Sequence, residues 1–113
     1  MEESILTSIK KLLGLTEEYT NFDTDIIIHI NSAFMVLNQI GVGPEEGFSI
    51  EDDSSTWDEY IPEDVKKLEA VKTYIYLKVK IVFDPPQSGI VMEAIKQSIA
   101  EYEWRLNVQN ESK

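Results

Sequence analysis

Cysteine is absent from this chain of 113 residues, and histidine occurs only once, at His29. Without cysteine there is neither a disulfide nor a thiolate, and one histidine excludes a multi-histidine metal site. Both glycine-rich phosphate-binding patterns are missing, and no nucleophile is evident beside His29, which we interpret as a structural or surface residue. We therefore expect no enzyme, no metal site and no cofactor.

Positive charge is missing from the first half of the chain. Between residues 12 and 65 there is no lysine or arginine, against thirteen aspartates and glutamates, and the net charge is −11. Such a protein does not bind nucleic acid by neutralising phosphates. It repels DNA or offers an acidic surface to a basic partner. A calcium-binding EF-hand loop needs glycine at its sixth position, but the sixth residue counted from Asp52 is Trp57. We therefore expect a solvated charged loop without a metal ion.

Long hydrophobic runs are also lacking. No apolar stretch approaches the roughly 20 residues that span a bilayer, so we expect no membrane segment. The hydrophobic fraction of 42% is ordinary for a folded protein. We expect one helical domain over residues 1–113, with a flexible tail at 108–113.

Apolar residues recur at helical spacing in four segments, which predicts an all-α bundle of about four helices. The first two segments end at glycines, Gly14 and Gly41, and Asp23 or Thr24 is a suitable N-cap for the second, with Phe22 as a staple residue. Ser88 is placed to cap the last. The predicted helices cover about residues 3–13, 25–40, 62–83 and 88–107.

The irregular acidic stretch at 42–56 separates the second helix from the central one. We expect a long loop with a short extended piece at 48–50, followed by a single helical turn at 56–60 capped by Ser54 or Ser55. Its acidic residues are candidates for an exposed acidic surface: Glu45, Glu46, Glu51, Asp52 and Asp53.

The central helix at 62–83 carries two apolar stripes on roughly opposite sides, whereas an ordinary surface helix carries one. The helix is therefore either sandwiched within its own domain or covered on one side by another chain. Ile28, Met35 and Trp104 also fall outside the core stripes of their helices. Trp57 is either an interface anchor or a pin that holds the loop to the core. The candidate interface residues are Ile28, Met35, Ala70, Tyr74, Leu77, Ile81 and Trp104.

Four pieces of the sequence together resemble the small head–tail connector proteins of long-tailed bacteriophages and prophages, also called head-completion or adaptor proteins. The pieces are FDTDIIIHINSAFMVLNQIGVGP at 22–44, Trp57 with Tyr60, YIYLKVKIVFDPP at 74–86 and IAEYEWRLN at 99–107. The resemblance covers nearly the whole chain, and none of these pieces is a catalytic signature.

This resemblance implies a mostly helical structural protein of the virion neck, assembled in the bacterial host cytoplasm. Such proteins form a ring, typically of twelve copies, beneath the portal, and the ring extends the DNA channel. The implied partners are the portal protein, the stopper or tail-completion protein and further copies of the chain, with DNA only as passing cargo. In such a ring the acidic loop residues would face the channel or the outer rim. The polar tail at 108–113 would become ordered on contact with the portal.

Two other interpretations are compatible with the same acidic charge and helical pattern. An acidic regulatory protein that mimics DNA would bind a DNA-binding partner, but it needs carboxylates spaced along one face, and here many cluster in one loop. A helical interaction module without a phage role differs from a connector only in the resemblance.

Overall fold

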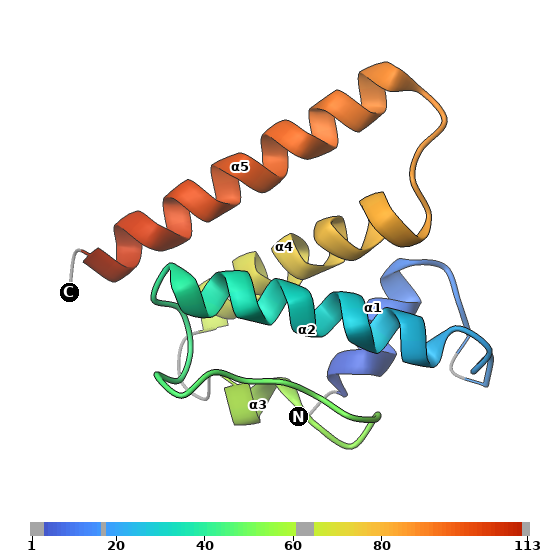
Figure 1. Ribbon diagram of the computed structural model, residues 1–113, viewed down its shortest axis with the longest axis horizontal. Coiled ribbons are helices and arrows are strands. Elements are labelled where there is room, and N and C mark those ends of the chain that lie inside the picture. The colour runs from blue at the N-terminus through green and yellow to red at the C-terminus, as the bar shows by residue number, and fades with distance from the viewer. Residues whose placement is uncertain (1–3, 17, 61–64, 112–113) are drawn as a thin grey trace.

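The computed structural model describes residues 4–16, 18–60 and 65–111, and within them it is helical (Figure 1). The described residues contain no strand, only one isolated bridge between Ser4 and Thr56. The all-α prediction is therefore confirmed. The helices are α1 (Ile5–Leu12), α2 (Asp23–Gln39), α3 (Trp57–Tyr60), α4 (Val65–Phe83) and α5 (Gly89–Glu111).

Helix α4 runs through the middle of the bundle, with α2 packed on one side and α5 on the other (Figure 1). Val71, Ile75 and Val79 of its first stripe are fully buried. Tyr74 of the second stripe is also fully buried, and its hydroxyl donates to Glu103 of α5 over 2.7 Å. The chain itself therefore sandwiches the central helix, which explains why its sequence has two apolar stripes.

Glycines end the first two helices, as predicted. Gly14 and Gly41 have φ of 85° and 88°, the left-handed conformation that side chains disfavour. After α1, the N–H of Leu15 donates to the carbonyl of Lys10 over 2.9 Å. The matching bond after α2 joins residues 42 and 37 over 2.8 Å. Both ends are Schellman motifs, which satisfy carbonyls that a helix end leaves open.

The start of α2 differs from the prediction. The helix begins at Asp23, Phe22 occupies the cap position, and no side chain caps the helix. The expected cap from Asp23 fails because its carboxylate instead lies 2.9 Å from the ammonium of Lys10 in α1. This ion pair ties the beginning of α2 to the end of α1.

The other helix limits agree with the prediction in part. Ser4 caps α1, and Ser88 caps α5 by accepting from the N–H of Val91 over 3.3 Å. The expected starts at residues 3 and 62 lie outside the described residues. Helix α5 continues to Glu111, so the predicted tail is helical over 108–111, and 112–113 are outside the described residues.

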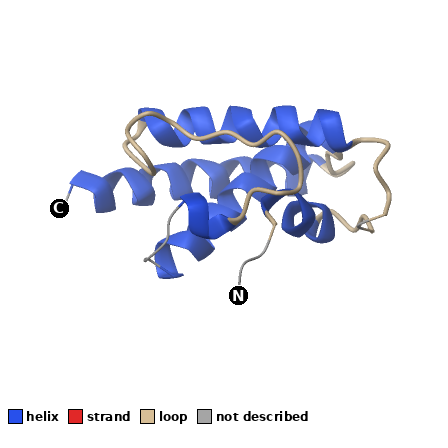
Figure 2. Ribbon diagram, turned by 90° about the horizontal axis from the view of Figure 1, so that it is seen from below, coloured by secondary structure: helices blue, strands red, loops and turns tan. Residues whose placement is uncertain are grey.

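The acidic loop has no regular structure between α2 and α3, as predicted, and crosses in front of the helices in Figure 2. It is nevertheless firmly attached. The side-chain amide of Asn31 exchanges two hydrogen bonds with the main chain of Ile50, of 2.9 and 2.8 Å. Phe48 packs with Phe34 and Tyr60 at ring-centroid separations of 5.1 and 5.2 Å. Side chains from α2 therefore define the path of this loop.

Helix α3 fixes the end of the loop to α1. Trp57 is only 2% exposed, and its indole N–H donates to the hydroxyl of Ser8 over 2.8 Å. Thr56 precedes the turn, and the carboxylate of Glu59 accepts from its N–H over 3.4 Å, as in a capping box. The cap is therefore Thr56 rather than Ser54 or Ser55, and Trp57 is a pin within the chain, not an interface anchor.

Candidate functional site

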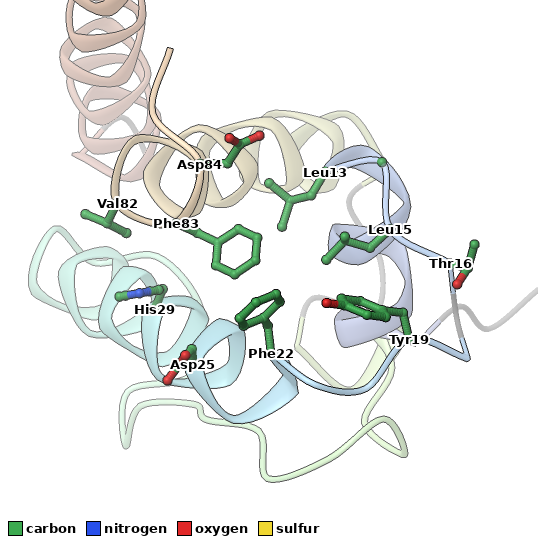
Figure 3. Close-up of a pocket in the computed structure, with 11 residues that line it drawn as sticks. Leu13, Leu15, Thr16, Tyr19, Phe22, Asp25, His29, Val82, Phe83 and Asp84 are labelled. Carbon is green, nitrogen blue, oxygen red and sulfur yellow. The ribbon is translucent and has the colours of Figure 1, made fainter. Parts of the chain in front are cut away.

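A cleft of about 750 Å³ opens where the end of α4 meets the start of α2 and the segment that follows α1 (Figure 3). Its aromatic part is a row of edge-to-face rings. Tyr19 and Phe22 have centroids 5.7 Å apart, and Phe22 and Phe83 are 5.3 Å apart. Leu13 and Leu15 also line the cleft, on the same side of it as Tyr19 in Figure 3. The cleft is therefore suited to a large apolar side chain.

Local sequence explains why the cleft exists. The left-handed Gly14 turns the chain sharply after α1 and directs the next residues past the end of α4. Helix α4 stops at Phe83 because Asp84 precedes Pro85, and the residue before a proline is disfavoured in the helical region. The last turn of α4 thus leaves Phe83 facing the cleft instead of covering it with a further turn (Figure 3).

The charged groups of the cleft are acidic. Asp25 and Asp84 belong to its lining, which contains no lysine or arginine among the residues that the structure describes. The Asp84 carboxylate lies 3.6 Å from the ammonium of Lys80 in the last turn of α4, an exposed pair that contributes little energy. His29 also lines the cleft, one turn after Asp25 on α2. An incoming segment with an apolar side chain and a positive charge fits this combination of residues.

The chemistry available in the described part of the chain is limited. No group of three or more histidine, cysteine, aspartate or glutamate side chains there is arranged to hold a metal ion. Burial raises the pKa of Tyr74, and the Glu103 carboxylate raises it further, while burial alone raises the pKa of Tyr60. Both hydroxyls therefore remain protonated near neutral pH. These are core residues and offer no surface for a substrate.

The predicted interface residues divide into two groups. Ile28 and Met35 are 55% and 64% exposed on α2, and Trp104 is 66% exposed on α5. Ala70, Leu77 and Ile81 are only partly exposed and pack against the core. Tyr74 is fully buried between α4 and α5, so its assignment to an interface with another chain is wrong. The second stripe is covered from within the protein because α5 packs on α4.

The acidic loop presents its carboxylates to solvent. All five predicted residues are exposed, but the structure does not bring them to the cleft: Glu45, Glu46, Glu51, Asp52 and Asp53. The pKa of Asp52 is lowered because its carboxylate accepts from the hydroxyl and the N–H of Ser54. Asp52 therefore keeps its negative charge to a lower pH than an ordinary aspartate does.

Sequence reasoning missed the cleft itself. Tyr19, Phe22 and Phe83 were not recognised as one group, because about sixty residues separate the first two from the third in the chain. The available signal was local: aromatic residues beside the chain turn at Gly14 and beside the double proline at 85–86. Only the packing of α2 on α4 brings these two places together.

A comparison with protein families gives the chain its context. The family model described as phage connector protein matches residues 5–113. The chain belongs to the phage connector protein family. Neither curated proteins nor solved structures gave a match. The match confirms the resemblance to phage head–tail connectors that the sequence indicated.

Membership in the phage connector family gives the protein a structural role in joining parts of the phage particle. The family is generally non-enzymatic, and its members are components of the virion that contact other capsid or tail proteins. No described helix of this connector is long and apolar enough to cross a bilayer.

Proposed function

We propose that this connector forms a ring in the neck of the virion, docks on the portal, extends the DNA channel and joins head to tail. Its partners are the portal protein, the stopper or tail-completion protein and further copies of itself.

 

The match to the connector family over residues 5–113 carries this proposal. DNA is only passing cargo in this role, and the ring assembles in the cytoplasm of the bacterial host, with twelve as the expected number of copies.

The exposed apolar residues support a ring. A subunit of a closed ring needs two different and complementary patches, because each copy meets one neighbour on each side. Ile28 and Met35 are exposed on α2, while Trp104 is exposed on α5. These two helices pack on opposite sides of α4. The connector therefore has exposed apolar side chains on two separate sides.

The acidic loop is suited to a channel through which DNA slides without sticking. Exposed carboxylates at 45–53 repel phosphates and offer no positive charge for them to bind. Cryo-electron microscopy of an assembled neck tests this placement. A loop found on the outer rim, far from the lumen, would contradict the sliding role while leaving the ring intact.

Negative-stain electron microscopy with light scattering tests the main proposal. The connector is examined alone and mixed with a purified portal ring. We expect rings, or an added layer on the portal. A connector that stays monomeric and does not bind the portal would contradict the proposal.

The net charge of −11 favours one second candidate, an acidic regulator that occupies a DNA-binding protein. The clustering of carboxylates in one loop argues against it, because a DNA mimic needs them along an extended face. Competition between this connector and DNA for a basic partner would support the regulator. The absence of such competition together with a portal layer would exclude it.

A further inference from the structure

Two features of matching chemistry lie toward opposite ends of the bundle. The cleft is at the end of α4, close to where the chain turns back into α5 (Figures 1 and 3). Trp104 lies fifteen residues into α5, which is about 22 Å along the helix axis at 1.5 Å per residue. The indole therefore cannot fill the cleft of its own chain.

The apolar parts of these two features fit each other. Trp104 is 66% exposed, which is unusual for a side chain of this size. The cleft offers the rings of Tyr19, Phe22 and Phe83, and aromatic pairs favour such edge-to-face surroundings. Its volume of about 750 Å³ accommodates an indole together with part of the helix that carries it.

The charges also fit. Arg105 follows Trp104 and is exposed, paired only loosely with Glu101 over 3.3 Å. The cleft contributes Asp25 and Asp84, of which Asp84 also lies 3.6 Å from Lys80, and its lining within the described residues includes no lysine or arginine. An indole that enters the cleft brings the guanidinium near two carboxylates, whereas an acidic partner segment would be repelled.

We propose that the cleft receives Trp104 of a second copy of this chain, with Arg105 directed toward Asp25 and Asp84. This inference rests on the proposed ring and names the contact that builds it. Because the two patches differ, the contact is heterologous, and it repeats from copy to copy until the rotation closes a ring.

Cysteine cross-linking tests the contact cleanly, because the natural chain has no cysteine. One variant carries Arg105→Cys with His29→Cys, and the matched control carries Ile90→Cys with His29→Cys. Ile90 is 85% exposed on the same helix but lies at its other end. Both variants are oxidised alone at high concentration and in the presence of the portal ring, after circular dichroism has verified their helical content.

The expected result is a ladder of cross-linked dimers and larger species for Arg105→Cys with His29→Cys, at least tenfold above the control. Adding Val82→Arg, which places bulk and positive charge at the cleft, should remove the ladder. A yield equal to the control, both alone and on the portal, would overturn the proposal.

Mixing provides a second, independent readout. A Trp104→Ala copy retains its cleft, and a Val82→Arg copy retains its indole. Each variant alone has only one half of the contact and should therefore not self-associate. Together they should form a one-to-one heterodimer in sedimentation experiments. If the Trp104→Ala variant adds a layer to the purified portal ring as the natural protein does, the contact is refuted and the proposed function stands. If the ladder forms but the natural protein ignores the portal, the proposed function fails and the contact stands.

Discussion

The two tryptophans of this connector occupy opposite environments. Trp57 belongs to a four-residue helix, yet it is 2% exposed, because the loop before it is tied to α2 and its indole bonds to Ser8. Trp104 belongs to a helix of 23 residues, yet it is 66% exposed, because α5 packs mainly on α4. Regular secondary structure is thus no guide to burial here; the number of neighbouring elements decides it.

The largest expected effect separates these tryptophans directly. Trp57→Ala leaves a cavity in the core and removes the donor to Ser8, so we expect a loss of about 3–5 kcal/mol of unfolding free energy. Trp104→Ala removes an exposed side chain and should change stability by less than about 0.5 kcal/mol. Urea unfolding followed by circular dichroism measures both. Equal losses of unfolding free energy in the two variants would show that the two tryptophans do not differ in their contribution to the core.

The ion pair between α1 and α2 comes next. Asp23→Ala removes a carboxylate from beside the ammonium of Lys10, which is 3% exposed, so we expect a loss of about 2–3 kcal/mol. Asp25→Ala is the matched control, since Asp25 is exposed in the same helical turn and should cost less than about 0.5 kcal/mol. The same urea titration compares the two, and similar midpoints would argue against a structural role for the pair.

A smaller effect is expected where the loop is attached. Asn31→Ala removes both hydrogen bonds to the main chain of Ile50 and should cost about 1–2 kcal/mol. Amide exchange at Ile50 should become faster while amides in the middle of α5 keep their rates. Ser32→Ala, at the neighbouring exposed position, is the control. Unchanged exchange at Ile50 would mean that the amide clamp does not hold the loop.

The smallest effect is a change of stability at alkaline pH. Burial raises the pKa of Tyr60 and Tyr74 above the ordinary value of 10.0. The unfolded chain then releases these protons first, so the stabilisation is complete below pH 10 and is lost as pH rises beyond it. The urea midpoint should therefore fall as the pH rises from 10 to 11, because tyrosine in the unfolded chain loses its proton near pH 10.

Tyr60→Phe should reduce this decline, because the Tyr60 hydroxyl has no hydrogen-bond partner within the described part of the chain. Tyr19→Phe is the control, since Tyr19 is exposed in the cleft region. An identical decline in both variants would show that the buried hydroxyl does not titrate with unfolding.

The helices were determined by the sequence to a large extent. Gly14, Gly41 and Ser88 mark helix ends because their effects are local: a left-handed conformation at glycine and a hydroxyl that accepts from a nearby N–H. The order of the elements followed from apolar spacing in the same way. The family resemblance was also carried by the sequence, and the family match confirms it.

Only the tertiary structure decided where each apolar surface goes. The two stripes of α4 were compatible with either an internal sandwich or a neighbouring chain, and the packing of α5 buried Tyr74. Asp23 left its expected capping role because Lys10, distant in sequence, lies beside it. The cleft is lined by residues from 13–16, 19–29 and 82–84, which local sequence rules cannot connect. Spacing along a chain reports which side chains share a face, whereas packing between elements determines which faces remain exposed.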